Sequence, residues 1–470
     1  MGWDVEIYEY RPDMRLPSYK AAAQQRSINL AISSRGIAAL QAIEPGAGER
    51  FLQAAIPMRA RMVHDSKGKL ASLPYDRNGQ CINSIDRALL NEDLLLEALA
   101  VPNVRIFFGH KVISANFDAR RLYVQDSESQ KEITVPFDFC VGADGSYSII
   151  RRQLMRIIRM DYQQAYLEHE YIELRMPAGP PKVLGGETTY LLDPNHLHIW
   201  PRHSFMLIAL PNKDKTFTCT LFAPASEFDK LDSAEKTLTW FRTHFPDAVP
   251  LMGEDSLLHD FQLNPRCSLV SVKAKPYHYM DRVIILGDAA HSMVPFFGQG
   301  LNCGLEDVRV LDRLLLNENV DPKFHPEYGM EDTRLARALQ TYSNTRHEDL
   351  ITISDLAMAN YLEMRHSVTT PTYLARKALD NFLYSWSSQQ VTPGSFTIAE
   401  KHDPFPTHWP SGWLPLYTMV TFRPDVSYAT VKRKADRQTE ILKEIGKFTA
   451  GFTLLTMAVT SIALLRRIRD

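Results

Sequence analysis

The fold is decided by the stretch Val283-Ile284-Ile285-Leu286-Gly287-Asp288-Ala289-Ala290-His291, which joins an apolar run directly to a turn that carries an acid. Four consecutive apolar residues of this kind predict a strand buried on both faces, as in a parallel sheet. The turn Gly298-Gln299-Gly300 follows, and a helix is predicted from Leu301 to about Leu315. Asp288 is therefore expected at the carboxyl end of a sheet, where open α/β folds bind ligands.

A second strand-end motif lies earlier in the chain. The run Phe137–Gly142 leads into Asp144-Gly145-Ser146-Tyr147-Ser148-Ile149-Ile150-Arg151, a D-G-x-x-S-x-x-R pattern. Either motif alone is a common strand–helix turn, but both in this order, each behind a predicted strand, are far more specific. The free N–H groups and the dipole at the helix start after Gly300 favour a negative charge beside them.

Composition narrows the class of protein. The chain has 470 residues, of which 45% are hydrophobic and 23% charged, which is typical of soluble globular proteins and excludes a disordered, collagen-like or polytopic membrane chain. Its 53 basic and 55 acidic residues give a net charge of −2, which implies no nucleic-acid partner. The five cysteines form no C-x-x-C pair, so we expect reduced thiols and no metal site.

The order of predicted elements indicates a discontinuous first domain. Trp3–Glu9 alternates like a strand and ends in an acid, while Asp86 is a helix cap before Arg87 to about Ala100. Between about Tyr166 and Leu269 the pattern is mostly strand, as in an antiparallel sheet. We therefore expect an α/β domain in two parts, 1–165 and 276–330, with an antiparallel-sheet domain at 166–275, C-terminal helices over 331–445 and a membrane anchor at 446–470.

The anchor rests on Phe448–Leu465, which is 18 residues long and has no charge. As a helix it would be about 27 Å long, close to the thickness of a hydrocarbon core. Five of its residues are Thr or Ser, as a buried core helix would allow. The cationic flanks, Lys443 and Lys447 before it and three arginines after it, favour a C-terminal transmembrane helix.

The two strand-end motifs resemble those of the single-component FAD-dependent aromatic hydroxylases. Glu9 after its strand resembles the acid that holds the adenosine ribose, and Arg87 in R-x-x-L-x-x-x-L resembles a cofactor-contacting helix. Within this group the chain is similar to the kynurenine 3-monooxygenases over nearly its whole length. The strings that carry this are RSINLA (26–31), PMRARM (57–62), HIWPR (198–202), NYLEMR (360–365) and LPLYTMV (414–420).

This resemblance implies a Rossmann-like FAD-binding domain with an inserted substrate domain. It implies hydroxylation of L-kynurenine to 3-hydroxykynurenine with NADPH and O2, in the kynurenine pathway of tryptophan degradation and pyridine nucleotide biosynthesis. The flavin C4a position carries the oxygen chemistry, so no catalytic side chain is expected, and His291 is interpreted as structural. The resemblance also places the enzyme on the mitochondrial outer membrane, tail-anchored, with its body facing the cytosol.

Residue by residue, the resemblance assigns two sets of contacts. The cofactor set is Tyr8, Glu9, Tyr10, Arg11, Ala31, Arg87, Val112, Asp288, Leu301 and Asn302. The substrate set is Arg61, Tyr75, Asn360 and Tyr417, with Phe297 and Gln299 near the aromatic ring. A guanidinium can bind an α-carboxylate through two hydrogen bonds, which suits Arg61. Without the resemblance, Arg61 would be interpreted as a surface ion pair and Tyr417 as a core tyrosine.

One feature departs from the family pattern. The ribose-binding acid normally follows a strand and G-x-G-x-x-G by about 20 residues, but Glu9 is the ninth residue here. We therefore expect the first strand and the phosphate loop to be missing from this sequence. Two hypotheses follow: a complete monooxygenase whose front is not in the sequence, or a membrane-anchored, non-catalytic remnant that cannot hold FAD. A related flavin reductase or halogenase is disfavoured by the strings around Arg61, Asn360 and Tyr417.

Overall fold

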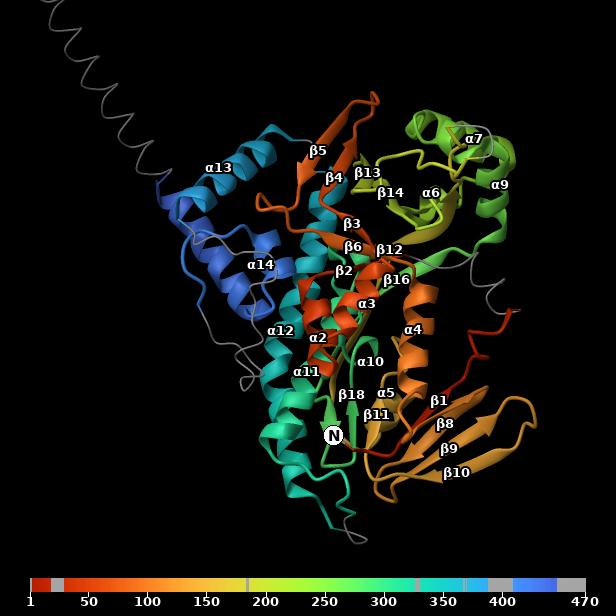
Figure 1. Cartoon of the computed structure of the whole chain (residues 1–470), viewed down its shortest axis with the longest axis vertical. Coiled ribbons are helices and arrows are strands. Elements are labelled where there is room, and N and C mark those ends of the chain that lie inside the picture. The colour runs from red at the N-terminus through yellow and green to blue at the C-terminus, as the bar shows by residue number, and fades with distance from the viewer. Residues whose placement is uncertain are drawn as a thin grey trace, which may run out of the picture.

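The structure is a computed structural model, and it describes residues 2–17, 29–182, 186–325, 330–366, 368, 370–387 and 409–445. Short parallel strands and helix α11 (Gly300–Asn317) occupy one half of the molecule, and the long helix α12 (Thr333–His366) runs from that half into the other (Figure 1). A large sheet with helices around it occupies the other half. The chain passes between the halves several times, so the functional site is built from segments far apart in sequence.

The strands behind the two motifs form and pair with each other in one sheet, while the strand that ends in Glu9 lies in a separate sheet. β1 (Val5–Glu9) pairs in parallel with β7 (Val104–Phe108). β11 (Cys140–Gly142) pairs in parallel with β18 (Val283–Ile285), and β17 (His278–Tyr279) is antiparallel to β18. The predicted run 137–142 is a strand only over its last three residues. Among the described residues no strand joins β1 to β11, so each ends its sheet.

The large sheet has seven strands and is mostly antiparallel, as expected. Its order is β16 (Cys267–Lys275), β12 (Asp161–Met176), β15 (Phe217–Pro224), β14 (Phe205–Pro211), β13 (His196–Arg202), β4 (Ala60–His64) and β5 (Leu70–Pro74). The last two strands come from outside the predicted 166–275 range. β13 and β4 pair in parallel, and this pairing brings Arg61 opposite Leu197 within the sheet.

Smaller elements complete the first half of the chain. Three antiparallel strands form one layer, namely β8 (His110–Asn116), β9 (Arg121–Asp126) and β10 (Glu132–Pro136), and three more form another, namely β2 (Leu30–Ile32), β6 (Ile82–Ile85) and β3 (Ile56–Met58). Helices α2 (Ser34–Ile43), α3 (Ala47–Gln53) and α4 (Arg87–Leu99) pack beside them. Asp86 caps α4 as predicted, because its carboxylate accepts hydrogen bonds from the amides of Ala88 and Leu89.

Helices dominate the rest of the chain. The insertion carries α6 (Ala225–Phe228), α7 (Ala234–His244), α8 (Val249–Met252) and α9 (Glu254–Leu263), and α5 (Ile149–Leu154), α10 (Asp288–His291) and the 3-10 turn η1 (Pro295–Phe297) follow strand ends. The main helices are α11 (Gly300–Asn317), α12 (Thr333–His366), α13 (Pro371–Ser387), α14 (Leu416–Phe422) and a helix over 428–445.

The predicted membrane segment Phe448–Leu465 and most of the predicted loop 389–413 lie outside the described residues. Across the part of the chain that the structure does describe, no helix is both long enough and apolar enough to span a bilayer. The five cysteines are all free thiols, and Cys140, Cys219 and Cys303 are buried.

Candidate functional site

The first strand-end motif is a helix cap joined to the second motif. The Asp144 carboxylate accepts hydrogen bonds from the Ser148 hydroxyl at 2.5 Å and from the amide of Ile149 at 2.6 Å. Arg151 is buried, and its guanidinium donates to the backbone oxygens of Ala289 and Ser146, each at 2.6 Å. The polar residues of this motif therefore hold the two strand ends in register.

Asp288, at the start of α10, lies in a recess. Its side chain is accessible to solvent, yet crowding by surrounding protein raises the pKa of its carboxyl, against the opposing charges of His291 and Arg87. A group that is both reachable and poorly hydrated lies in a hollow rather than on an open surface. Beside it, Gly287 has a φ of 56°, and no atom lies within 4 Å of the place where a Cβ would be. This hollow suits a bound polar ligand such as the ribityl chain of a flavin.

The turn before α11 is fastened by Asn302. The amide nitrogen of this fully buried side chain donates to the backbone oxygens of Ala31 at 2.8 Å and Gly298 at 2.6 Å. Its oxygen accepts from the amide of Ser33 at 2.8 Å. Both ends of the Asn302 side chain are thus used within the protein. Its backbone at the helix start is the part that remains for a cofactor.

The other predicted cofactor residues lie on or just after β1, on β8, and at the starts of α4 and α11. Glu9 ends β1, and its carboxylate accepts from the amide of Arg11 at 2.8 Å. Tyr8 stacks on Phe107 with ring centroids 5.0 Å apart, and Tyr10 is 61% exposed. Val112 packs against the main hydrophobic core, and Leu301 packs beside α2 and α4. The charge of Arg87, at the start of α4, acts to lower the pKa of Asp288, which indicates that this end of α4 lies near the recess.

The predicted substrate residues meet at one cavity of about 330 Å³. Its lining includes Arg61 of β4, Tyr75 just after β5, Phe297 of η1, Asn360 of α12 and Tyr417 of α14. These five residues span more than 350 positions of sequence, and the parallel pairing of β4 with β13 helps to bring Arg61 to them. The structure therefore places the predicted substrate set in one chamber.

Arg61 is a buried cation whose charge the protein compensates poorly. Its residue is 6% exposed, and its Nε has no partner among the described residues. The nearest carboxylate oxygen, that of Glu363, lies 3.9 Å from Nη1. The guanidinium carbon lies 4.8 Å from the Tyr417 ring centroid and 5.6 Å from that of Tyr75. Aromatic faces stabilise a cation only partly, so a ligand anion is the natural partner here.

An aromatic wall adjoins the guanidinium. Tyr75 and Tyr417 stack with centroids 5.0 Å apart and planes at 11°, and Tyr417 stacks on Phe297 at 5.5 Å and 9°. The Tyr75 hydroxyl is buried and has no hydrogen-bond partner in the described chain. Burial raises the pKa of Tyr75, so this hydroxyl stays protonated and can donate to a ligand oxygen.

The remaining two predicted residues are largely committed to the protein. Asn360 lines the cavity, but its amide nitrogen donates to the backbone oxygen of Phe296 at 2.7 Å. Gln299 is buried, accepts a hydrogen bond from the Tyr428 hydroxyl at 3.1 Å, and is not among the residues that line the cavity. Gln299 thus supports the turn that carries Phe297, and the structure does not bring it to the substrate set.

The polar cavity residues that sequence reasoning missed include Glu363, Tyr373 and Lys377. The Tyr373 hydroxyl donates to the Glu363 carboxylate at 3.0 Å. Burial lowers the pKa of Lys377 to about 8, Arg61 adds repulsion, and Glu363 opposes both. Glu363 follows Asn360 by one helical turn, which was a usable signal. Tyr373 and Lys377 share one face of α13 but belong to no motif.

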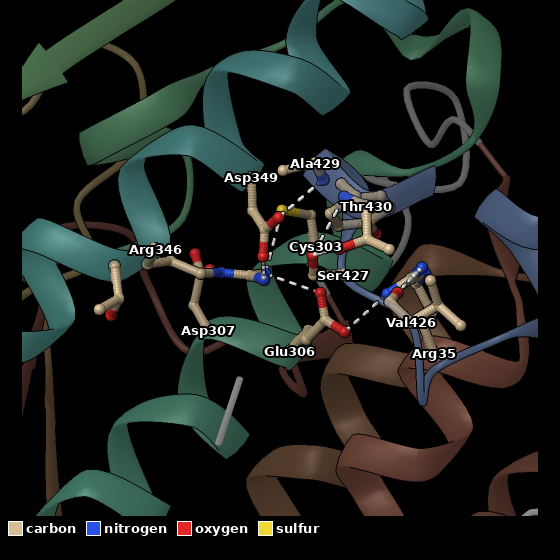
Figure 2. A network of polar contacts seen from close by, with 12 residues as sticks. Arg35, Cys303, Glu306, Asp307, Arg346, Asp349, Val426, Ser427, Ala429 and Thr430 are labelled. Atoms are coloured by element: carbon tan, nitrogen blue, oxygen red, sulfur yellow. Dashed lines mark hydrogen bonds and ion pairs between the residues drawn. The ribbon is translucent and has the colours of Figure 1, made fainter. Parts of the chain in front are cut away.

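A buried ionic network holds the C-terminal wall of the cavity (Figure 2). Glu306 lies between Arg35 at 2.9 Å and Arg346 at 2.8 Å. Arg35 also donates to the backbone oxygens of Val420 and Val426, both at 2.6 Å. Since Val420 belongs to α14, these bonds fix the helix that carries Tyr417.

The same network contains His291, Cys303 and Asp307, whose potential ligand atoms lie within 4.8 Å of one another. Arg346 donates to Asp307 at 3.0 Å and to the Cys303 sulfur at 3.6 Å, so a guanidinium already supplies the positive charge. Burial raises the pKa of the Cys303 thiol, which disfavours the thiolate that a metal requires. His291 forms a hydrogen bond with Asp307, and its structural role stays a prediction.

Comparison with known proteins places the chain. The family model "FAD binding domain" matches residues 32–343. Kynurenine 3-monooxygenase from Cryptococcus neoformans var. neoformans serotype D (strain B-3501A) is 43% identical, covering 97% of this chain and 93% of that protein. The chain belongs to the kynurenine 3-monooxygenase family. Kynurenine 3-monooxygenase from Saccharomyces cerevisiae is 40% identical over 96% of this chain and 91% of its own length.

Solved structures support the fold of this family member. The tetrameric form of 2-methyl-3-hydroxypyridine-5-carboxylic acid oxygenase is 19% identical, covers 79% of this chain and 89% of its own, and has a TM-score of 0.58. p-Nitrophenol 4-monooxygenase from Pseudomonas putida is 17% identical, with 80% and 87% coverage and a TM-score of 0.57. By its family model and its relatives, the chain is an FAD-dependent monooxygenase.

Proposed function

We propose that the chain hydroxylates L-kynurenine to 3-hydroxykynurenine, using FAD, NADPH and O2. The relatives that cover nearly all of it carry the name of this activity. The observation that carries the proposal is Arg61, a buried cation at the cavity wall, which lies beside an aromatic wall and whose nearest carboxylate oxygen in the described chain, that of Glu363, is 3.9 Å away. An amino acid with an aromatic ring supplies a carboxylate for the Arg61 guanidinium and a ring that packs against the aromatic wall.

Different residues of the cavity contact different groups of the substrate. Arg61 and the Tyr75 hydroxyl bind the α-carboxylate, because a guanidinium and a protonated phenol both donate to carboxylate oxygens. Glu363, held by Tyr373, is the acid available for the α-ammonium group. Phe297 and Tyr417 pack against the aromatic ring. This arrangement positions the substrate for hydroxylation at the ring carbon ortho to the aniline nitrogen. No side chain needs to act as an acid or a base.

The cofactor belongs at the strand ends. Asp288 would hold the ribityl hydroxyls, Glu9 the adenosine ribose, and the start of α11 at Leu301 and Asn302 the pyrimidine edge of the flavin. When bound, FAD would supply the redox chemistry, namely acceptance of hydride from NADPH and activation of O2. The protein's own contribution is to position the ring and to limit the water around it, and the buried Phe297 lines the cavity for that purpose.

Product formation under labelled oxygen tests the proposal. The purified chain, supplied with FAD, NADPH and L-kynurenine under ¹⁸O2, is expected to yield 3-hydroxykynurenine that carries one ¹⁸O atom. A chain that holds FAD stoichiometrically but converts no L-kynurenine contradicts the proposed substrate. A chain that neither retains FAD nor forms product instead supports the non-catalytic alternative.

We also propose that residues 446–470 anchor the protein in the mitochondrial outer membrane with its body toward the cytosol. The support is the uncharged Phe448–Leu465 with basic flanks on both sides.

A further inference from the structure

Helix α13 has two faces of opposite character. One face turns inward, and Tyr373, Lys377 and Asp380 on it line the substrate cavity. The opposite face turns to solvent and is mostly apolar, with Ser385 as an exposed polar residue on it. Leu374 is 44%, Leu379 40%, Phe382 62% and Trp386 82% exposed. Since these four fall within about 140° around a helix of 3.6 residues per turn, they form one stripe, which we call the α13 stripe.

The stripe is unusual for a surface left in water. Scattered single apolar residues are normal on any protein, but a contiguous apolar patch marks a contact surface. The positions between its members, Ala375 and Ala378, are also exposed and apolar. The charged residues of α13 instead lie toward the cavity, where Arg376 pairs with Asp380 at 3.0 Å. The helix therefore presents a polar side to the site and an apolar side outward.

The position of the stripe indicates what covers it. The helix over 428–445 lies beside α13, and both line the same cavity (Figure 1). Ile441 and Ile445 at its end are 41% and 53% exposed. The sequence that follows is the uncharged segment Phe448–Leu465, with basic residues on both sides. The apolar surface of α13 is thus next to the point from which the most membrane-compatible sequence of the chain departs.

We propose that α13 lies in the plane of a phospholipid surface, with Leu374, Leu379, Phe382 and Trp386 sunk into the boundary between headgroups and acyl chains. A one-sided apolar helix of 17 residues, about 26 Å long, suits an interfacial position and not a span. The stripe ends in a tryptophan, a residue that is enriched at membrane–water interfaces. The bilayer then holds the outer face of a wall whose inner face lines the substrate cavity.

Lipid-dependent quenching in the full chain tests this contact. Phe382→Cys carries a polarity-sensitive fluorophore, and Ile133→Cys on β10, 39% exposed, carries the same label as the control. The unsubstituted chain, labelled in parallel, gives the background from Cys81 and Cys267. Vesicles of phosphatidylcholine and phosphatidylserine are used with either plain or acyl-brominated phosphatidylcholine. Both substituted positions are exposed, so folding is expected to survive, and circular dichroism checks that it does.

The label at 382 is expected to shift to the blue on vesicles and to lose most of its emission with brominated lipid, while the label at 133 changes in neither way. A chain that floats with the vesicles but shows an unquenched label at 382 overturns the proposal, as does a chain that does not float at all. A blue shift at 382 that grows with protein concentration without lipid assigns the stripe to a second copy of the chain and also overturns the proposal. Phe382→Glu with Trp386→Glu should remove the contact, and Ile133→Glu should not.

Discussion

Arg151 Nη1 donates a hydrogen bond to the backbone oxygen of Ala289 at 2.6 Å, and this bond joins the two strand-end motifs that frame the cofactor recess. A second nitrogen of the same guanidinium binds the Ser146 oxygen, so one buried side chain spans both turns. The D-G-x-x-S-x-x-R pattern therefore acts mainly as a clamp. Its acid caps a helix, and its arginine holds the neighbouring strand end in place.

Replacing Arg151 with Gln should loosen this clamp. Two charge-assisted hydrogen bonds are lost and two carbonyl oxygens are left poorly satisfied, which costs about 2–4 kcal/mol of stability. The flavin content, measured by absorbance of the purified protein, should fall together with the thermal midpoint. Arg152→Gln, at the exposed neighbouring position, should change neither quantity. Full flavin content and an unchanged midpoint in R151Q would show that the clamp is unimportant.

Arg61→Gln should raise the KM for L-kynurenine by about 10- to 100-fold, because a charge-assisted contact with the carboxylate is worth roughly 1.5–3 kcal/mol. Flavin content should stay near that of the unchanged chain, since Arg61 lines the cavity and not the recess. Steady-state kinetics and absorbance measure the two effects separately.

Two further variants make that result specific. Arg59→Gln removes a charge from an exposed position two residues away and should leave KM unchanged. Arg61→Lys keeps the charge but loses the planar guanidinium, so its KM should lie between that of the unchanged chain and that of Arg61→Gln. If R61Q lost FAD and substrate affinity in equal measure, Arg61 would have a structural role only.

Lys377 should make substrate affinity depend on pH. Burial, with repulsion from Arg61, lowers its pKa to about 8, so the ammonium group is charged below that pH and neutral above it. The cavity therefore loses one positive charge as the pH rises from 7 to 9, and KM for L-kynurenine should rise over that interval. Lys377→Met should have a higher KM at pH 7 and a flatter profile. A profile in K377M identical to that of the unchanged chain would exclude this role.

Glu306 should make the protein sensitive to acid. Burial alone would raise its pKa, but Arg346, Arg35 and Arg309 outweigh burial and lower it to about 2. A carboxyl whose folded pKa lies below its unfolded value contributes stability that is present above about pH 4.5 and is lost as the pH falls toward 2. The shift corresponds to about 3 kcal/mol.

Urea unfolding at several pH values measures that contribution. Glu306→Gln should unfold at lower urea at pH 7 and lose less stability between pH 4.5 and 3 than the unchanged chain. Glu348→Gln removes the acid of an exposed pair with Arg433 and serves as the control, with little change expected. Parallel pH profiles in E306Q and the unchanged chain would remove Glu306 as the cause.

Deletion of residues 448–470 should release the protein from mitochondrial membranes into the soluble fraction after carbonate extraction. The uncharged segment provides most of the apolar area available for insertion, and the α13 stripe alone gives only a reversible contact. A truncated protein that resists extraction as firmly as the full chain would place the anchor elsewhere.

The predictable part of the fold lies where local signals are strong. The strands β14 and β15 form within the predicted strand region, and the Asp86 cap and the helix after Gly300 form as expected, because alternation, capping and glycine placement act over a few residues. The pairing of β4 with β13 was not predictable in this way. It joins residues more than 130 positions apart, and neither strand encodes its partner.

The site shows the same division. The family resemblance indicated Arg61, Tyr75, Asn360 and Tyr417, which the structure gathers around one cavity. Without the resemblance, Arg61 and Tyr417 would have been interpreted as structural residues. Lys377 escaped notice because a lysine on a helix with one apolar face is ordinarily a solvated residue. In the folded chain it lines the cavity together with residues of the helix over 428–445.

Calorimetric titration with L-kynurenine and with kynuramine, which has the same ring but no carboxylate, tests most directly whether the Arg61 cavity is the substrate site. The flavin-loaded chain should bind L-kynurenine at least about tenfold more tightly than kynuramine, and Arg61→Gln should abolish that difference. Equal affinities for the two compounds in the unchanged chain, or a difference that survives in R61Q, would contradict the account.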